Sequence, residues 1–467
     1  MRIAFFSPLP PQTSGIADYS AELLPELARH LEIELIIEDG FRPARELADR
    51  FPVHEIAAFP GLAGAGRFDC VLYHLGNNRD YHAAIYRTVL DYPGVVVLHE
   101  FVLHHLVRDL TLFAGDPAAY VRELRYAYGL SGEAMARRCL ETGVPLDPWA
   151  YPLFERVVDR SRGLIVHNRT TERRVLASRP LARLARVPHH LSLRGVSGLA
   201  ADTANAADAA DRQAARAALG IPPEAYVVAT FGFLTAAKRP GVLLRAFARF
   251  RREAPHARLL LVGEVSPHFD FASLATPDLM AGVSVTGRLE LAGFLSYMAA
   301  ADLAVNLRHP SAGETSGTLI RLLGMGKPVV VSNTGAFAEV PDGCCAKVDV
   351  GDGEEDLLLA YLQRLAADEP LRRQMGDNAR RHVATHHSLA ASARAYADFL
   401  HATVATGAAP FRALPPLAPY PPEDLLSDLV RDLAADLSDL GLTEADDDLL
   451  APFAAALVDL DLDLAAS

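Results

Sequence analysis

The stretch LAVNLRHPSAGETSGTLIRLLGMGKPVVVSN, residues 303–333, decides the fold class of this chain. LAVNL (303–307) and PVVVSN (328–333) are short apolar runs, and each predicts a buried strand. Between them, a loop of small polar residues leads into an apolar helical pattern that begins near Thr315. Strand, loop, helix and strand in this order predict one unit of a parallel α/β sheet.

The same alternation extends along the chain in both directions. Further strands are predicted at 2–7, 33–37, 70–75, 95–99 and 164–167, and then at 226–233, 257–263, 283–287 and 346–350. These runs are nearly continuous, as expected for parallel strands that are covered on both faces. We therefore expect an α/β protein with two Rossmann-like doubly wound domains in tandem.

The expected domain organisation follows from changes in composition. We expect a first domain over 1–196, a low-complexity linker or insertion over 197–212, a second domain over 213–387, a closing helix over 388–405, and a Pro-rich linker with an acidic amphipathic tail over 406–467. The tail is predicted to pack as two short helices on the body or a sister subunit. The alternative is a segment that docks a protein partner.

The charge of the chain is concentrated in this tail. The formal net charge is −13, and residues 423–467 hold thirteen acids and one base, which leaves the body near neutral. No basic face is present, so nucleic acid is not an expected partner. The apolar runs are far shorter than the ~20 residues of a membrane span, and MRIAFFSPLPP does not resemble a secretory signal.

The four cysteines show no CxxC spacing, so neither a zinc site nor a disulfide framework is predicted. We expect no metal and a cytoplasmic location. The sequence also lacks the G-x-G-x-x-G fingerprint after its first strand, which disfavours a nicotinamide enzyme.

Two loops of the first domain are candidate ligand loops. SPLPPQTSGIADYS (7–20) follows the first strand, where ligands of parallel sheets bind, and Gly15 would let a phosphate approach the backbone. A turn glycine with a capping Ser14 or Asp18 explains it equally well. VVVLHEFVLHH (95–105) places His99 at a strand end. Its spacing to His104 is five residues, so the H-E-x-x-H zinc motif is absent.

The second domain supplies further candidates at its strand ends. In FGFLTAAKRP (231–240), Gly232 ends a strand and Lys238 precedes a helix, which suits a phosphate. Arg288 in VTGRLE is a similar case. The alternative is that these bases are solvated at loop surfaces.

The loop GETSG and the following helix form the last candidate site. The backbone N–H groups of Thr315, Ser316, Gly317 and Thr318 are predicted to lie at a helix N-terminus and to cradle a diphosphate. Glu314 would be repelled by phosphate, so a sugar hydroxyl is its natural partner. An acid that merely stabilises the helix is the alternative.

Together these segments, over roughly residues 1–405, resemble the family-4 (GT4) glycosyltransferases with the GT-B fold. SGIADYS looks like the glycine-containing loop of the family, VVLHEF like its strand with an active-site histidine, and RVPHHLSL (186–193) like the strand that leads into the second domain. FGFLTAAKRP resembles "GRL…KG". GETSGTLIRLLGMGKPVVVSNTGAFAEV resembles "EGFGLPxLEAMAxGxPVVAS…GGxxEi", and here Glu339 also recurs in order.

The resemblance implies two Rossmann-like domains facing across a cleft, with the helix 388–405 crossing back to the first domain. It implies a retaining, metal-independent glycosyltransferase without a cofactor, whose donor is a nucleotide-diphosphate sugar. His99 and Glu314 would be catalytic, Gly15, Gly232, Lys238, Arg288 and Thr315 to Thr318 would bind the donor, and the acceptor would be a glycan, a lipid-linked glycan or a small molecule. A peripheral position at the inner membrane face is compatible with this activity.

Two positions depart from the family pattern. The pattern has two glutamates spaced E-x7-E, and they fall on Gly313 and Arg321 here, so that Glu314 is displaced by one residue. The second glutamate of the family holds the donor ribose. The arginine of "GRL" is Phe233, so one phosphate-side cation is missing. These departures keep two alternatives open, a catalytically degenerate binding or scaffold protein and a GT-B sugar-nucleotide epimerase.

Overall fold

The computed structural model describes residues 1–191, 204–410 and 451. Within them, the first domain contains a seven-stranded parallel sheet in the order β3-β2-β1-β4-β5-β6-β7. Its strands are β1 (Arg2–Phe6), β2 (Glu32–Ile37), β3 (Val53–Glu55), β4 (Cys70–Leu75), β5 (Val95–Leu98), β6 (Gly163–Val166) and β7 (Leu184–Arg186). The edge strands β3 and β7 have three residues each, none of them buried, so the apolar pattern does not predict them.

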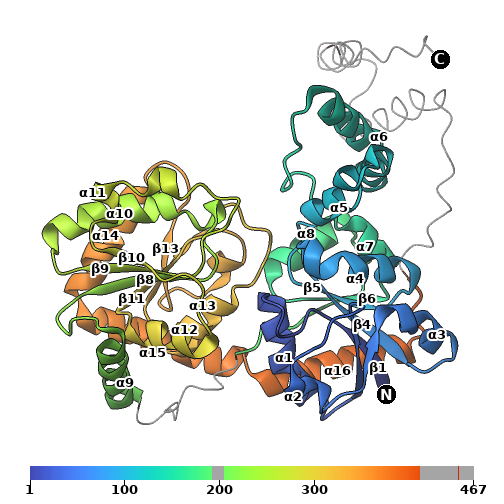
Figure 1. Cartoon of the computed structure of the whole chain (residues 1–467), viewed down its shortest axis with the longest axis horizontal. Coiled ribbons are helices and arrows are strands. Elements are labelled where there is room, and N and C mark those ends of the chain that lie inside the picture. The colour runs from blue at the N-terminus through green and yellow to red at the C-terminus, as the bar shows by residue number, and fades with distance from the viewer. Residues whose placement is uncertain (192–203, 411–450, 452–467) are drawn as a thin grey trace.

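The second domain is built on a parallel sheet with the order β10-β9-β8-β11-β12-β13. Its strands are β8 (Val227–Phe231), β9 (Arg258–Val262), β10 (Val283–Val285), β11 (Leu303–Asn306), β12 (Val329–Ser332) and β13 (Ala346–Val348). The described strands of this sheet coincide with the predicted ones. The two α/β domains therefore confirm the predicted fold class (Figure 1).

Helices and short turns cover both faces of each sheet. In the first domain these are α1 (Gly15–Leu27), α2 (Arg45–Ala48), η1 (Ile56–Ala58), α3 (Phe59–Gly64), α4 (Arg79–Asp91), α5 (His104–Leu110), η2 (Leu112–Ala114), α6 (Pro117–Thr142), α7 (Glu155–Arg160) and α8 (Arg169–Ser178). In the second they are α9 (Ala204–Leu219), η3 (Ala236–Lys238), α10 (Pro240–Glu253), η4 (Ala272–Leu274), α11 (Pro277–Met280), α12 (Leu291–Ala300), α13 (Gly317–Gly324), η5 (Gly335–Glu339), α14 (Glu354–Ala367) and α15 (Glu369–His386). The last helix, α16 (Leu389–Ala405), packs on the first domain.

Strand β5 shows why the apolar runs are continuous. Successive side chains of a strand point to opposite faces of its sheet. Val95 and Val97 belong to the core on one face, whereas Val96 and Leu98 belong to the core on the other. All four side chains are fully buried or nearly so.

The helix α16 returns from the second domain to the first and packs along α1 (Figure 1). Tyr396 of α16 is fully buried, and its hydroxyl lies 2.9 Å from that of Tyr19 on α1. Ala393, Ala397 and Leu400 join the same apolar core. Both domains are therefore connected by two chain segments, the second of which is anchored by a buried helix.

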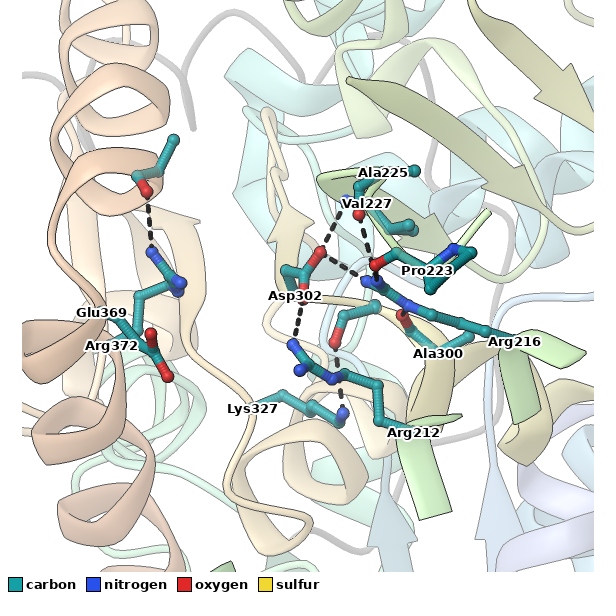
Figure 2. A network of polar contacts seen from close by, with 12 residues as sticks. Arg212, Arg216, Pro223, Ala225, Val227, Ala300, Asp302, Lys327, Glu369 and Arg372 are labelled. Atoms are coloured by element: carbon teal, nitrogen blue, oxygen red, sulfur yellow. Dashed lines mark hydrogen bonds and ion pairs between the residues drawn. The ribbon is translucent and has the colours of Figure 1, made fainter. Parts of the chain in front are cut away.

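The segment 197–212 is not a linker throughout, because α9 begins at Ala204 and runs to Leu219. Arg212 and Arg216 of this helix bind the two carboxylate oxygens of Asp302, at 2.7 Å and 2.5 Å (Figure 2). Asp302 also accepts a hydrogen bond from the backbone N–H of Val227 at 2.7 Å. One buried carboxylate thus fixes α9 to the sheet of the second domain, a role that an alanine- and aspartate-rich composition does not reveal.

Figure 2 shows how completely Arg216 is satisfied. Its guanidinium also donates to the carbonyl oxygens of Ala300, Pro223 and Ala225, at 3.0 to 3.1 Å. The acidic tail predicted over 406–467 lies outside the described residues, apart from 406–410 and 451. Within the described part of the chain, no helix has both the length and the apolar character needed to cross a membrane.

Candidate functional site

Several candidate residues lie near the point at which the strand order of each sheet reverses. The strand order reverses between β1 and β4 in the first domain and between β8 and β11 in the second. In parallel sheets, ligands bind outside the carboxyl ends of the strands at such points. The segments that follow β1, β5, β8 and β11 carry most of the predicted site residues.

The loop before α13 differs in detail from its prediction. Helix α13 begins at Gly317, two residues later than Thr315, because Ser316 is its N-cap and accepts a hydrogen bond from the N–H of Leu319 at 3.2 Å. The N–H groups of Gly317 and Thr318 belong to the first turn, which has no intrahelical acceptors. This N-terminus favours an anion.

Lys238 lies beside this helix. Its ammonium nitrogen donates to the carbonyl oxygen of Phe231. A Cβ on Gly232, whose φ is +84°, would lie 2.8 Å from that nitrogen and 3.8 Å from the hydroxyl of Thr318. Glycine at 232 therefore leaves the space that Lys238 occupies. Burial, reinforced by nearby Arg308, holds the pKa of Lys238 well below its usual range.

Glu314 is bound within its own loop. One carboxylate oxygen lies 2.9 Å from Nε of Arg308. The other accepts hydrogen bonds from the N–H of Ala312 at 2.7 Å and the hydroxyl of Ser311 at 3.2 Å. The carboxylate is therefore held in place by an ion pair. Its predicted contact with a sugar remains a prediction.

The first domain contacts this loop directly. The N–H of Phe101 donates to the carbonyl oxygen of Ala312 at 2.8 Å. Asn168 and Thr171 donate to the carbonyl oxygen of Gly313 at 2.7 Å and 2.9 Å. Gly313 has a φ of +84°, and a Cβ there would lie 2.3 Å from the Phe101 ring. A glutamate at 313, as in the family pattern, would not fit this contact.

His99 belongs to a cluster of imidazoles around Tyr19. Its Nε2 lies 3.0 Å from Nδ1 of His74, and its ring centroid lies 5.1 Å from that of Tyr19 and 4.9 Å from that of His167. Burial, and then the nearby histidines, hold the pKa of His99 well below its usual range. His99 is therefore a neutral hydrogen-bonding group at pH 7. Within the described residues, no cluster of histidine, cysteine or acidic side chains has the geometry of a metal site.

Glu100 is a site residue that the sequence reasoning missed. Its carboxylate accepts a hydrogen bond from the N–H of Asn77 at 2.8 Å. Burial, and then the charge of Glu314 across the domain junction, raises the pKa of Glu100 to about 7, while Arg308 acts in the opposite direction. The available signal was its position next to His99 at a strand end. In the sequence, Glu100 stands between His99 and His104, whose spacing does not match a zinc motif and gives no role to the acid.

The remaining two candidates lie on the surface. Gly15 opens α1 directly after its N-cap Ser14, and a Cβ there would have no protein atom within 4 Å. Packing does not require glycine at this position. Arg288 is exposed in the loop between β10 and α12, where its charge acts on Asp18 of α1. The structure does not bring Arg288 into contact with Lys238, so its role as a phosphate ligand remains a prediction.

A family model described as "Glycosyl transferases group 1" matches residues 225–368, which include Lys238, Arg308 and Glu314. The match covers less than a third of the chain and lies within the second domain. D-inositol 3-phosphate glycosyltransferases of Stackebrandtia nassauensis and Mycobacterium tuberculosis are 32% and 33% identical to this chain over 186 and 189 residues. These matches cover 37% and 38% of this chain, and the chain spans only 41% and 37% of the length of these relatives.

Solved structures of glycosyltransferases with the GT-B fold are similar to this chain along most of its length. Sucrose-phosphate synthase from Thermosynechococcus elongatus is 15% identical, with a TM-score of 0.62 over 87% of this chain and 99% of that one. HepE from Anabaena, in complex with UDP-glucose, is 14% identical, with a TM-score of 0.58 over 86% of this chain and 100% of that one.

Glu339 of the second domain, near the end of the motif, reaches into the first domain. Its carboxylate accepts hydrogen bonds from the N–H groups of Arg169 and Thr170, at 2.9 Å and 2.7 Å, and from the Thr170 hydroxyl at 2.7 Å. These groups form the start of α8. Glu339 therefore caps a helix of the opposite domain.

Proposed function

We propose that this protein is a family-4 (GT4) glycosyltransferase that transfers a sugar from a nucleoside-diphosphate sugar to an acceptor hydroxyl. The observation that carries the proposal is the charged cluster at the domain junction. Lys238, Arg308 and Glu314 come from the second domain. Glu100, which feels the charges of Glu314 and Arg308, comes from the first domain. His99 precedes Glu100 on the same loop. HepE, which shares the fold, is bound to UDP-glucose, and this supports the class of donor.

The proposed transfer retains the configuration of the sugar. The bond between the anomeric carbon and the donor phosphate oxygen breaks, and the acceptor oxygen bonds to that carbon on the same face. The acceptor hydroxyl proton passes to the departing diphosphate. Negative charge grows on the diphosphate in the transition state, so preorganised donors there lower the barrier.

The residues have separate roles in this proposal. The first turn of α13 and Lys238 receive the diphosphate. A bound diphosphate would favour the charged form of Lys238, because an opposite charge raises the pKa of an amine. Glu314 positions Arg308 and, with Glu100 and His99, faces the sugar. The positive groups at the cradle lead us to propose a reaction without a metal ion.

The wider setting is proposed from the same reasoning. The acceptor is a glycan, a lipid-linked glycan or a small molecule, and the protein works in the cytoplasm or at the inner face of the membrane. Gly15 lies on the loop after β1, and its open surroundings suit the donor phosphates or the acceptor.

The test is incubation with a panel of UDP-, GDP- and ADP-sugars, with the released nucleotide measured by chromatography. We expect slow hydrolysis of one donor, which is lost in Lys238→Ala and Glu314→Ala. Lys347→Ala is the matched control, because Lys347, on β13, forms its own ion pair with Asp342 at 2.8 Å. Anomeric configuration by NMR tests retention, and activity in excess EDTA tests the absence of a metal requirement.

A second candidate is a GT-B-like binding or scaffold protein. It is favoured by the contact between Gly313 and Phe101, which occupies the place of a family glutamate, and by Glu314, which is satisfied within its own loop. Calorimetry that detects no binding of any nucleoside diphosphate would overturn the transferase and support this candidate. Interconversion of sugar isomers without an acceptor would support an epimerase instead.

A further inference from the structure

Arg321 forms an ion pair across the domain junction. Its Nη2 lies 2.6 Å from a carboxylate oxygen of Glu22 on α1, although 299 residues separate the two in the sequence. Both side chains are 15% exposed. The other oxygen of Glu22 lies 3.4 Å from Nε2 of His190, a buried residue of the segment that follows β7.

The second guanidinium nitrogen of Arg321 lies close to Gly317, the first residue of α13, where the ring of His189 is the other neighbour. Side chains on a helix lean toward its N-terminus, so a residue one turn into the helix covers the first turn. A Cβ built on Gly317, the first residue of α13, would lie 3.6 Å from Nη1 of Arg321. The guanidinium therefore extends from the helix N-terminus to Glu22.

The surrounding charges are balanced. Asp18, one turn before Glu22 on α1, feels Arg321 and Arg288 as well as Glu22 and Glu290. Arginine 321 is thus placed among groups of both signs at the edge of the junction. Glu22 fixes one edge of its guanidinium, and a guanidinium carries five N–H donors in a rigid plane.

The other cations near the cradle are already engaged. Lys238 donates to a backbone carbonyl, and its pKa is held low by burial. Arg308 is paired with Glu314 at 2.9 Å. Position 233, where the family pattern has an arginine, holds a phenylalanine with 48% of its side chain exposed. The place of one phosphate-side cation of the family pattern is therefore unfilled, and Arg321, beside Gly317, is positioned to act there together with Lys238.

We infer that Arg321 is a ligand of the donor diphosphate and that Glu22 of the first domain orients it. The inference rests on the proposed function. A guanidinium held by Glu22 at one edge binds phosphate oxygens with another, which gives short, charge-assisted hydrogen bonds. Because the same side chain contacts the diphosphate and α1, donor binding also favours the closed arrangement of the domains.

Calorimetry on the full chain tests this role with three probes: inorganic pyrophosphate, the nucleoside diphosphate that wild type binds best, and the matching nucleoside. We expect Arg321→Gln to weaken the binding of both diphosphates about tenfold to a hundredfold and to leave the affinity for the nucleoside unchanged. Arg321→Lys should lose less of the diphosphate affinity, because lysine keeps the positive charge although it lacks the planar guanidinium. Arg245→Gln is the matched control, since Arg245 pairs with Glu355 on the surface at 2.8 Å.

The charge swap Glu22→Arg with Arg321→Glu separates a phosphate ligand from a structural latch. The swap restores the interdomain ion pair but places an acid at the cradle, so pyrophosphate should bind no better than to Arg321→Gln. Recovery of wild-type affinity in the swap overturns the inference, as does unchanged pyrophosphate affinity in folded Arg321→Gln. An equal loss for the nucleoside assigns Arg321 to the ribose or base and also overturns it. Wild type that binds no nucleoside diphosphate overturns the proposed function itself.

Discussion

Replacing Glu100 by glutamine should stabilise the protein, and the gain should grow with pH. The folded state raises the pKa of Glu100 from 4.5 to about 7, first through burial and then through Glu314. The folded protein thus binds this proton more tightly than the unfolded chain does. Below pH 4.5 Glu100 is protonated in both the folded and the unfolded state, so it does not lower the stability of the fold there. Between pH 4.5 and 7 the unfolded chain ionises first, so the folded state loses relative stability.

The size of the effect follows from the two pKa values. One pKa unit corresponds to about 1.4 kcal/mol, so the rise from 4.5 to about 7 costs the folded state about 3 kcal/mol above pH 7. Glutamine has nearly the shape of the protonated acid and keeps an oxygen for the N–H of Asn77. Glu100→Gln should therefore match wild type near pH 4.5 and exceed its free energy of unfolding by about 3 kcal/mol at pH 8.

Urea unfolding at pH 4.5, 6 and 8 measures this difference. Trp149, the one tryptophan of the sequence, lies in the first domain and reports on its unfolding by fluorescence. Glu46→Gln on the exposed face of α2 is the control and should show no such trend. Glu314→Gln should reduce the gain, because Glu314 is the second cause of the raised pKa. A stability difference between Glu100→Gln and wild type that is the same at pH 4.5 and pH 8 would refute the reasoning.

Three substitutions probe the contacts that join the elements. Gly313→Ala should lower the free energy of unfolding by about 1–3 kcal/mol, because the added Cβ would clash with the Phe101 ring. Replacing that ring by the smaller side chain of leucine, in Phe101→Leu, should recover part of the lost stability in a thermal melt. Glu339→Ala should cost about 1 kcal/mol by removing its hydrogen bonds to the first turn of α8, and small-angle scattering should detect a larger radius of gyration. Asp302→Ala leaves Arg216 buried without its carboxylate and should cost about 3 kcal/mol in urea unfolding, whereas an unchanged midpoint would exclude this anchoring role.

Local patterns accounted for the elements but not for their ends. Helix α13 was expected from Thr315 and begins at Gly317, because Ser316 uses its hydroxyl to cap the helix. Strands β3 and β7 were missed, since three partly exposed residues give no apolar run. The linker predicted over 197–212 includes the first part of helix α9. Its alanines and aspartates carry little signal, and its attachment depends on Asp302, some ninety residues later.

The candidate site also contains residues that the sequence predicts and residues that only the folded structure identifies. Lys238, Glu314 and His99 could be proposed because each follows a strand, and the carboxyl ends of parallel strands lie along one edge of their sheet. Glu100 is not predicted from the sequence, because its raised pKa depends on burial and on charges of the opposite domain. Arg308 is not predicted either, because its role depends on its ion pair with Glu314 in the folded loop.

The sequence by itself determined the two parallel α/β sheets and the loops that carry the site. Buried parallel strands require continuous apolar runs, and such runs are visible within a few neighbouring residues. Only the tertiary structure decided that Phe101 closes on Gly313, that Glu339 caps α8, and that Arg321 meets Glu22. These contacts join residues from about 170 to 299 positions apart. Local preferences do not encode them, because they depend on how two separately folded sheets are placed against each other.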